Sequence, residues 1–346
     1  MATCYLHIGA PKCASTSIQR SFQSSRDWLA EDGLLYPRSD NARHDFLVSV
    51  HHENPVELKV HSRFGLDRDA VRDLARQQQD AFEALVVSHP GADAFLSTEL
   101  LFEQAPKMDL GGMKQYLHQH FDKVVVVALI RDPLAWVNSS AQETVKSGSS
   151  TLEAVVDNPV LPRFETIERY RDMFGTEALR VHPLETLSDG ATSLVSGFAN
   201  WLFGENRFAG RLPDLSINES VPLEGLMIAS EVNKFAGIAL GQTRMASGDE
   251  GEVRGLSAQD FRKIGRTRFR LPAARVAQLL PRLQAQYDYL NATWGTSYAP
   301  PDLSTWEDPV AIWDQETFAS IGRAMNDLGQ SVLHLRAELR KSRSKA

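Results

Sequence analysis

The sequence has few cysteines, no long apolar run and no excess of positive charge. Cys4 and Cys13 are the only cysteines among 346 residues, which excludes a disulfide framework and favours a reducing compartment. No apolar run approaches the length of a membrane-spanning helix. The first predicted strand begins at about Thr3, which leaves no room for a signal peptide. We therefore expect a cytoplasmic protein without a membrane span.

Positive charge is scarce over the whole chain, which carries 44 acidic and 37 basic residues and a formal net charge of −7. Nucleic-acid binders are usually basic, so we expect no nucleic-acid partner. One basic cluster lies between residues 254 and 275 and contains Arg262, Lys263, Arg266, Arg268 and Arg270. This cluster either meets a phosphate or an anionic acceptor, or forms a solvated helix face.

The chain is 42% hydrophobic, enough for a sizeable core. Strands predicted at residues 4–8, 94–97, 123–130 and 178–182 alternate with helices as far as about residue 205. Residues 123–130 (KVVVVALI) are apolar on both faces, as expected for the middle of a parallel sheet. The remaining patterns, at 222–235, 273–294 and 316–340, are helical. The pattern predicts an α/β fold, with a P-loop-like parallel sheet flanked by helices and a mostly helical C-terminal portion.

The stretch from Thr3 to Ser21 reads as a strand, a tight loop and a helix start rich in hydroxyl groups. Gly9-Ala10-Pro11 forms the turn, and Ser15-Thr16-Ser17 opens the helix. Free N–H groups and the positive end of the helix dipole at such a start favour an anion. Lys12 adds a mobile positive charge there. The order of residues is not that of a Walker A loop, GxxxxGK[ST].

A second candidate for anion binding follows the strand at 123–130. Arg131 ends this strand, and Ser139 comes after seven intervening residues, on the next predicted helix. Ligands of α/β proteins bind at the carboxyl ends of parallel strands. The planar guanidinium fork of arginine matches a phosphate, and a serine hydroxyl adds a donor.

These two motifs resemble those of the sulfotransferases. Pro11-Lys12-Cys13-Ala14-Ser15-Thr16 is similar to the family's 5′-phosphosulfate loop, PKxGTT or PKxxST, with Ala14 where glycine is usual, and RDPLAWVNS (131–139) resembles its 3′-phosphate motif. The resemblance covers residues 1 to about 235 and is to bacterial cytoplasmic members. It implies transfer of a sulfuryl group from 3′-phosphoadenosine 5′-phosphosulfate to a hydroxyl, without a metal. The implied donor-binding residues are Pro11, Lys12, Cys13, Ala14, Ser15, Thr16, Ser17, Arg131 and Ser139, and Lys12 is also implied in catalysis.

The acceptor hydroxyl needs a base, and the sequence offers two. His44 follows the segment LLYP, where some sulfotransferases place a catalytic carboxylate, and its neutral ring is a good base near pH 7. Glu99 follows the strand at 94–97, where cytosolic-type enzymes place a catalytic histidine. Both remain candidates. The acceptor expected is a carbohydrate-like or small hydroxylated molecule.

Two other functions compete with a sulfotransferase. The chain could be a non-catalytic nucleotide-binding or interaction module that keeps the loop, or a kinase-like phosphotransferase. The second is disfavoured because the Walker A order and an evident aspartate for magnesium are missing. By position in the chain we expect a donor-binding core at 1–235, a helical acceptor or cap region at 236–305, and a long C-terminal helix at 306–346.

The C-terminal helix has an apolar seam with steps of three and four residues, made by Phe318, Ile321, Met325, Leu328, Val332, Leu335 and Leu339. Such a seam over about three heptads is typical of a coiled coil. We expect the helix either to pair with another helix, which would make a homo-oligomer if a second subunit supplies it, or to dock onto its own domain.

Overall fold

The structure is a computed structural model that describes residues 1–62, 64–205, 207–208, 210–215, 220–235 and 258–343. Residues 236–257, which open the predicted cap region, lie outside the described residues. So do the side chains of Leu328, Val332, Leu335 and Leu339 in the predicted seam. Contacts divide the chain into two compact units. The first comprises Met1–Trp136, Leu161–Asn218 and Arg282–Pro300, and the second comprises Val137–Val160, Glu219–Pro281 and Pro301–Ala346. The predicted boundaries at 235 and 305 stay a prediction.

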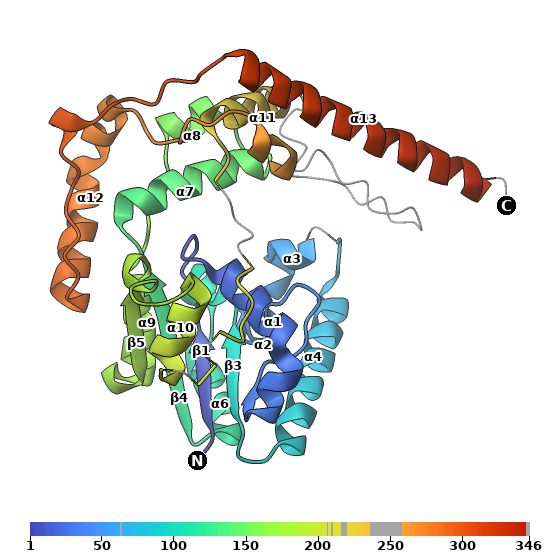
Figure 1. Ribbon diagram of the computed structural model, residues 1–346. Coiled ribbons are helices and arrows are strands. Elements are labelled where there is room, and N and C mark those ends of the chain that lie inside the picture. The colour runs from blue at the N-terminus through green and yellow to red at the C-terminus, as the bar shows by residue number, and fades with distance from the viewer. Residues whose placement is uncertain (63, 206, 209, 216–219, 236–257, 344–346) are drawn as a thin grey trace. The chain divides into compact units, whose positions relative to one another are not determined.

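The first unit is built around a five-stranded sheet in the order β2-β3-β1-β4-β5, in which every neighbouring pair is parallel (Figure 1). The strands are β1 (Thr3–His7), β2 (Leu34–Leu35), β3 (Asp93–Ser97), β4 (Lys123–Ile130) and β5 (Leu179–Pro183). All residues of β4 after Lys123 are buried, because helices cover both faces of the sheet. The predicted α/β fold with a parallel sheet is therefore confirmed.

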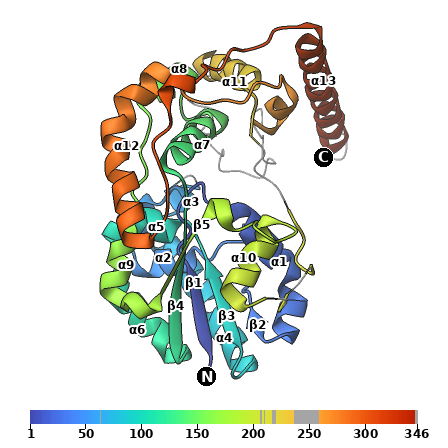
Figure 2. The same cartoon turned by 60° about the vertical axis from the view of Figure 1, so that its left-hand side comes forward.

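Helices α1 and α10 pack together on one face of this sheet, and α6 and α9 cover the other (Figure 2). On the α1 face, the ring centroids of Phe22 and Phe95 lie 4.6 Å apart and those of Phe95 and Phe198 lie 5.7 Å apart. The helices of this unit are α1 (Ser15–Glu31), α2 (Phe46–His51), α3 (Lys59–Ser62), α4 (Arg68–Ser88), α5 (Leu100–Gln104), α6 (Leu110–His120), α9 (Thr166–Phe174) and α10 (Leu194–Phe203).

The sheet order places the loops that carry the predicted site next to one another. β1 pairs with β3 through Leu6 and Leu96, and with β4 through Leu6 and Val126. The carboxyl ends of these three strands therefore meet at one edge of the sheet, where α/β proteins bind ligands. The segments that begin with Gly9, Glu99 and Arg131 all start there.

Two helices, α7 (Pro133–Lys146) and α12 (Ala273–Trp294), contribute residues to both units. The second unit also contains α8 (Leu152–Asp157), α11 (Leu223–Phe235) and α13 (Gln315–Arg343). The helices predicted at 222–235, 273–294 and 316–340 are confirmed as α11, α12 and α13. None of the described helices combines the length and apolar character needed to cross a membrane.

Glu224 of α11 organises the second unit. This buried carboxylate accepts hydrogen bonds from the Thr267 hydroxyl at 2.5 Å, the Ile312 N–H at 2.7 Å, and the Arg266 and Thr267 N–H groups at 3.2 Å. Burial acts to raise the pKa of Glu224, but these bonds outweigh it and the pKa is lowered. Gly265 is required beside it, because a Cβ there would lie 2.1 Å from a Glu224 oxygen.

Helix α13 is anchored at its start by polar side chains. Asp314 and Glu316 form ion pairs with Arg266, and Thr317 and Ser320 are buried. The seam residues Phe318 and Met325 are 60% and 68% exposed. Within the described residues, these two seam side chains are therefore left largely to solvent. Pairing of the helix with a partner stays a prediction.

Candidate functional site

The loop between β1 and α1 has an unusual backbone. Gly9, Lys12 and Ala14 all adopt positive φ angles, of 54°, 64° and 61°. The left-handed region costs a residue with a Cβ roughly 1–2 kcal/mol. Glycine avoids this cost, which gives a physical reason why the similar motifs carry glycine at the position of Ala14. The loop is thus bent sharply at three places within six residues, and it ends at the first turn of α1.

The N-terminus of α1 has donors to offer a ligand. No side chain caps it within the described part of the chain, and the first hydrogen bonds toward the helix run from the Ser17 and Ile18 N–H groups to the Ala14 carbonyl. The N–H groups at the start of a helix have no partner within it and attract anions. Thr16 and Ser17 are partly exposed in this first turn, whereas Ser15 is buried.

The carbonyls of the loop are held by donors from the end of β4 and the start of α7. Arg131 donates to the Lys12 carbonyl at 2.9 Å, and the Trp136 indole N–H donates to the Pro11 carbonyl at 2.6 Å. In a trans peptide the carbonyl and the next N–H point in opposite directions. The N–H groups of Lys12 and Cys13 therefore face away from these donors. The Cys13 side chain is buried, and the Cys13 backbone N–H donates to the Ala10 carbonyl at 3.3 Å.

Glu99 lies directly against the loop. A Cβ added at Gly9 would come within 3.4 Å of both Cα and Cγ of Glu99, and within 3.2 Å of the Ser15 hydroxyl oxygen. Burial raises the pKa of Glu99, the positive charge of Lys12 opposes the shift, and the nearby carboxylate of Glu103 reinforces it. The structure therefore brings Lys12, Arg131 and Glu99 together at the carboxyl ends of three adjacent strands.

His44, the other candidate base, is buried with both ring nitrogens bonded to backbone groups. Nε2 donates to the Pro37 carbonyl at 2.9 Å, and Nδ1 accepts from the Ser97 N–H at 2.8 Å. The His44 N–H also donates to the Ser97 carbonyl at 2.9 Å. Burial lowers the pKa of His44 to about 4, against the opposing effects of the Pro37 bond and the charge of Asp45. The ring fastens the segment after β2 to the end of β3, and both nitrogens are already used.

Two buried polar groups beside the site were not predicted from the sequence. The Thr98 hydroxyl donates to Asp45 at 2.5 Å, and Asp45 also pairs with Arg43 at 2.7 Å. This arrangement fixes the residue that precedes Glu99. No local pattern marks it, because Asp45 and Thr98 are far apart in the chain.

The second group lies beneath the loop. His7 Nδ1 and the Ser97 hydroxyl are 2.8 Å apart, and the Gln19 amide donates to the same hydroxyl at 3.0 Å. These contacts join β1, β3 and α1. Burial lowers the pKa of His7 to about 3, so this histidine is neutral at neutral pH.

Ser139 lies on α7 within the second unit, whereas Arg131 belongs to the first. Their joint action on one phosphate stays a prediction. The described part of the basic segment also lies in the second unit, where Arg266 pairs with Asp314 at 2.6 Å and Arg270 lies 4.7 Å over the Trp306 ring. Arg266 and Arg270 thus stabilise their own unit. Within the described residues, no group of three or more histidines, cysteines or carboxylates is suited to a metal ion.

The solved structures that are similar to this chain include two sulfotransferases. The chain is similar to a sulfotransferase from Alicyclobacillus acidocaldarius, with 15% identity, a TM-score of 0.34, and coverage of 71% of this chain and 96% of the other. It is also similar to the sulfotransferase domain of the Synechococcus PCC 7002 olefin synthase, with 11% identity, a TM-score of 0.35, and coverage of 75% and 93%. No protein-family model and no curated protein matches the sequence.

Proposed function

We propose that this protein is a cytoplasmic sulfotransferase that transfers a sulfuryl group from 3′-phosphoadenosine 5′-phosphosulfate to a hydroxyl of a small, carbohydrate-like acceptor. The observation that carries the proposal is the meeting of Lys12, Arg131 and Glu99 around one strongly bent loop in front of an uncapped helix. Binding of an anion, stabilisation of a leaving group and removal of a proton each have a residue of the appropriate chemistry there.

The loop is suited to the 5′ end of the donor. Backbone N–H groups of Ala14, Ser15 and Thr16 and the dipole of α1 favour the phosphosulfate. The Lys12 ammonium stabilises the negative charge that grows on the bridging oxygen during transfer. Arg131 has further N–H donors besides the one that bonds to the loop, and these suit the 3′-phosphate, with Ser139 as a second donor.

We assign the base to Glu99 and a positioning role to His44. Both nitrogens of His44 bond to backbone groups, so it has no lone pair ready for a substrate proton. Glu99 adjoins the loop, and burial raises its pKa toward the working pH, which improves a carboxylate as a base. The acceptor oxygen forms a bond to sulfur while the bond from sulfur to the bridging oxygen breaks. Glu99 takes the hydroxyl proton, and the bond electrons leave on adenosine 3′,5′-bisphosphate.

The test combines ligand binding with turnover. Calorimetry should detect adenosine 3′,5′-bisphosphate and not ATP with magnesium, and an acceptor screen with radiolabelled donor should yield a sulfated hydroxyl compound. Lys12→Ala should reduce transfer about a hundredfold or more, as expected for loss of one charge-stabilising donor. Arg20→Ala changes an exposed positive residue on α1, the helix that follows the loop, and serves as the control.

The outcomes separate the competing functions. Binding of the bisphosphate without turnover of any acceptor would favour the non-catalytic module. Preference for ATP with magnesium would favour a phosphotransferase. Unchanged transfer by Lys12→Ala would contradict the assignment of the loop.

A further inference from the structure

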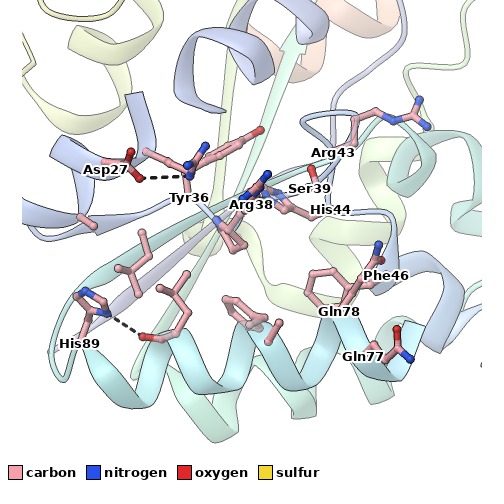
Figure 3. A pocket seen from close by; sticks show the side chains of 17 residues that line it. Asp27, Tyr36, Arg38, Ser39, Arg43, His44, Phe46, Gln77, Gln78 and His89 are labelled. Carbon is pink, nitrogen blue, oxygen red and sulfur yellow. Dashed lines mark hydrogen bonds and ion pairs between the residues drawn. The ribbon is translucent and has the colours of Figure 1, made fainter. Parts of the chain in front are cut away.

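A pocket of about 560 Å³ lies beside the edge strand β2 (Figure 3). Its lining comes from α1, from β2 and the segment after it, from the first residue of α2 and from α4, and does not include Lys12, Glu99 or Arg131. Arg26, its first lining residue on α1, lies about 16 Å along the helix from Ser15, at 1.5 Å per residue. The volume falls in the range of roughly 300–1,000 Å³ that is usual for small-molecule sites.

Much of the lining of this pocket is apolar. Ala81, Phe82 and Leu85 form a stripe on α4, where spacings of three and four residues place side chains on one face. Ala81 to Leu85 span about 6 Å at the rise of an α-helix, and the polar Gln77 and His89 flank them on either side (Figure 3). Further apolar lining comes from Ala30, Leu35, Tyr36, Pro37 and Phe46.

The charged groups at the pocket favour an anion. Three arginines line it against one aspartate, although the whole chain is acidic. Arg26 pairs with Asp27 at 3.3 Å, and Arg43 pairs with Asp45. Arg38 forms no ion pair with any residue that the structure describes. It lies across the pocket from the α4 stripe, next to Ser39 (Figure 3).

We propose that this pocket binds a single-chain organic anion, with the alkyl chain along the α4 stripe and the carboxylate at Arg38. The apolar lining suits an alkyl chain better than a compact polar molecule, because burial of CH₂ groups is favourable. The carboxylate supplies a negative partner for the positive charge of Arg38, and the charged hydrogen bond between them adds to the affinity. The pocket is lined by Arg43 and His44, which lie near the proposed base, but not by Lys12, Glu99 or Arg131.

The experiment measures binding of decanoate to the full-length protein by calorimetry, below the concentration at which decanoate forms micelles. Decanol is the matched ligand without charge, and acetate is the charge without the chain. Decanoate should bind at least tenfold more tightly than either. Arg38→Gln should weaken decanoate binding about tenfold and leave decanol unaffected, while Arg76→Gln, at an exposed arginine of α4 outside the pocket, should change neither.

A second pair of variants tests the place of the chain. Ala81→Trp fills the pocket from α4 and should abolish binding, whereas Ala84→Trp, also on α4 but outside the lining, should not. Both alanines are exposed, so both variants should fold, which circular dichroism checks. Absence of decanoate binding, or equal binding by the two tryptophan variants, would overturn the proposal. Equal affinities for decanoate and decanol would overturn the role given to Arg38.

Discussion

Replacement of His44 by phenylalanine should destabilise the protein while sparing its chemistry. Phenylalanine keeps the ring that packs 4.6 Å from Tyr36, centroid to centroid, but loses both ring nitrogens. The Ser97 N–H and the Pro37 carbonyl then remain buried without these partners. Each such group costs about 1–3 kcal/mol, so the free energy of unfolding should fall by about 2–6 kcal/mol. Chemical denaturation measures this change, with the exposed His118→Phe as the control.

The same variant should alter the pH dependence of stability. The pKa of His44 is lowered to about 4 in the folded protein, against about 6.5 when unfolded. Between these values the unfolded chain binds a proton that the folded protein does not. The contribution of His44 to the free energy of unfolding is therefore fully present above pH 6.5 and is lost as pH falls toward 4. The slope for one histidine is about 1.4 kcal/mol per pH unit. His7 contributes a slope of the same sign, and His44→Phe should remove only its own share.

Glu99→Gln should have the opposite effect to His44→Phe, because it should remove turnover and not stability. It retains the shape of the side chain but cannot accept the acceptor proton, so turnover at saturating donor should fall about a hundredfold or more, with little change in donor affinity. Because burial raises the pKa of Glu99, the acid limb of the wild-type turnover profile should lie above the usual range of a glutamate. At a temperature where both variants are folded, His44→Phe should keep its turnover. A His44→Phe protein of unchanged stability and lost turnover, beside an active Glu99→Gln protein, would refute this assignment.

Arg131→Ala should weaken the binding of adenosine 3′,5′-bisphosphate at least tenfold and the binding of adenosine 5′-phosphate much less. Equal losses of affinity in calorimetry would assign the arginine to the loop alone. Ala14→Gly should raise the stability measured by denaturation by about 0.5–1 kcal/mol, because it relieves a left-handed alanine, whereas Ala84→Gly, within α4, should lower it by about 1 kcal/mol. Glu224→Gln should cost about 1–3 kcal/mol, and since the pKa of Glu224 is lowered, the difference from wild type should vanish as pH falls through that pKa. Removal of residues after 322 spares the polar anchor of α13 and should convert a dimer into a monomer in sedimentation. A full-length protein that already sediments as a monomer would rule out pairing of α13 between subunits.

The strands could be predicted because their signal is local. A run such as KVVVVALI is buried on both faces, and few structures other than a central parallel strand require that. The helices of the C-terminal half could also be predicted, from their periodicity. The division into two units could not be predicted, because Arg282–Pro300 joins the first unit although it follows much of the second in sequence. Such a return of the chain is decided by long-range packing.

The candidate site also has one part that the local sequence predicts and another that only the fold reveals. The loop from Gly9 to Ser17 and the strand-final Arg131 are contiguous patterns with a chemical meaning. The bond from Trp136 to the Pro11 carbonyl has no such local signal, because it joins residues 125 positions apart. His44 was proposed as a base from its residue type and position. A neutral imidazole, with one donor and one acceptor, is equally able to join two backbone groups, and only the fold shows that it does so.

Ala14 stands where the similar motifs carry glycine, so the bent loop needs additional hydrogen bonds to hold it. Lys12 and Ala14 together incur a backbone cost of about 2–4 kcal/mol in the left-handed region. The bonds from Trp136 and Arg131 to the loop carbonyls offset a similar amount, since a neutral hydrogen bond contributes about 1 kcal/mol and a charged one about 1.5–3 kcal/mol. One N–H group of Arg131 therefore holds the loop in its bent form, and under the proposed function the remaining donors of this arginine bind the 3′-phosphate.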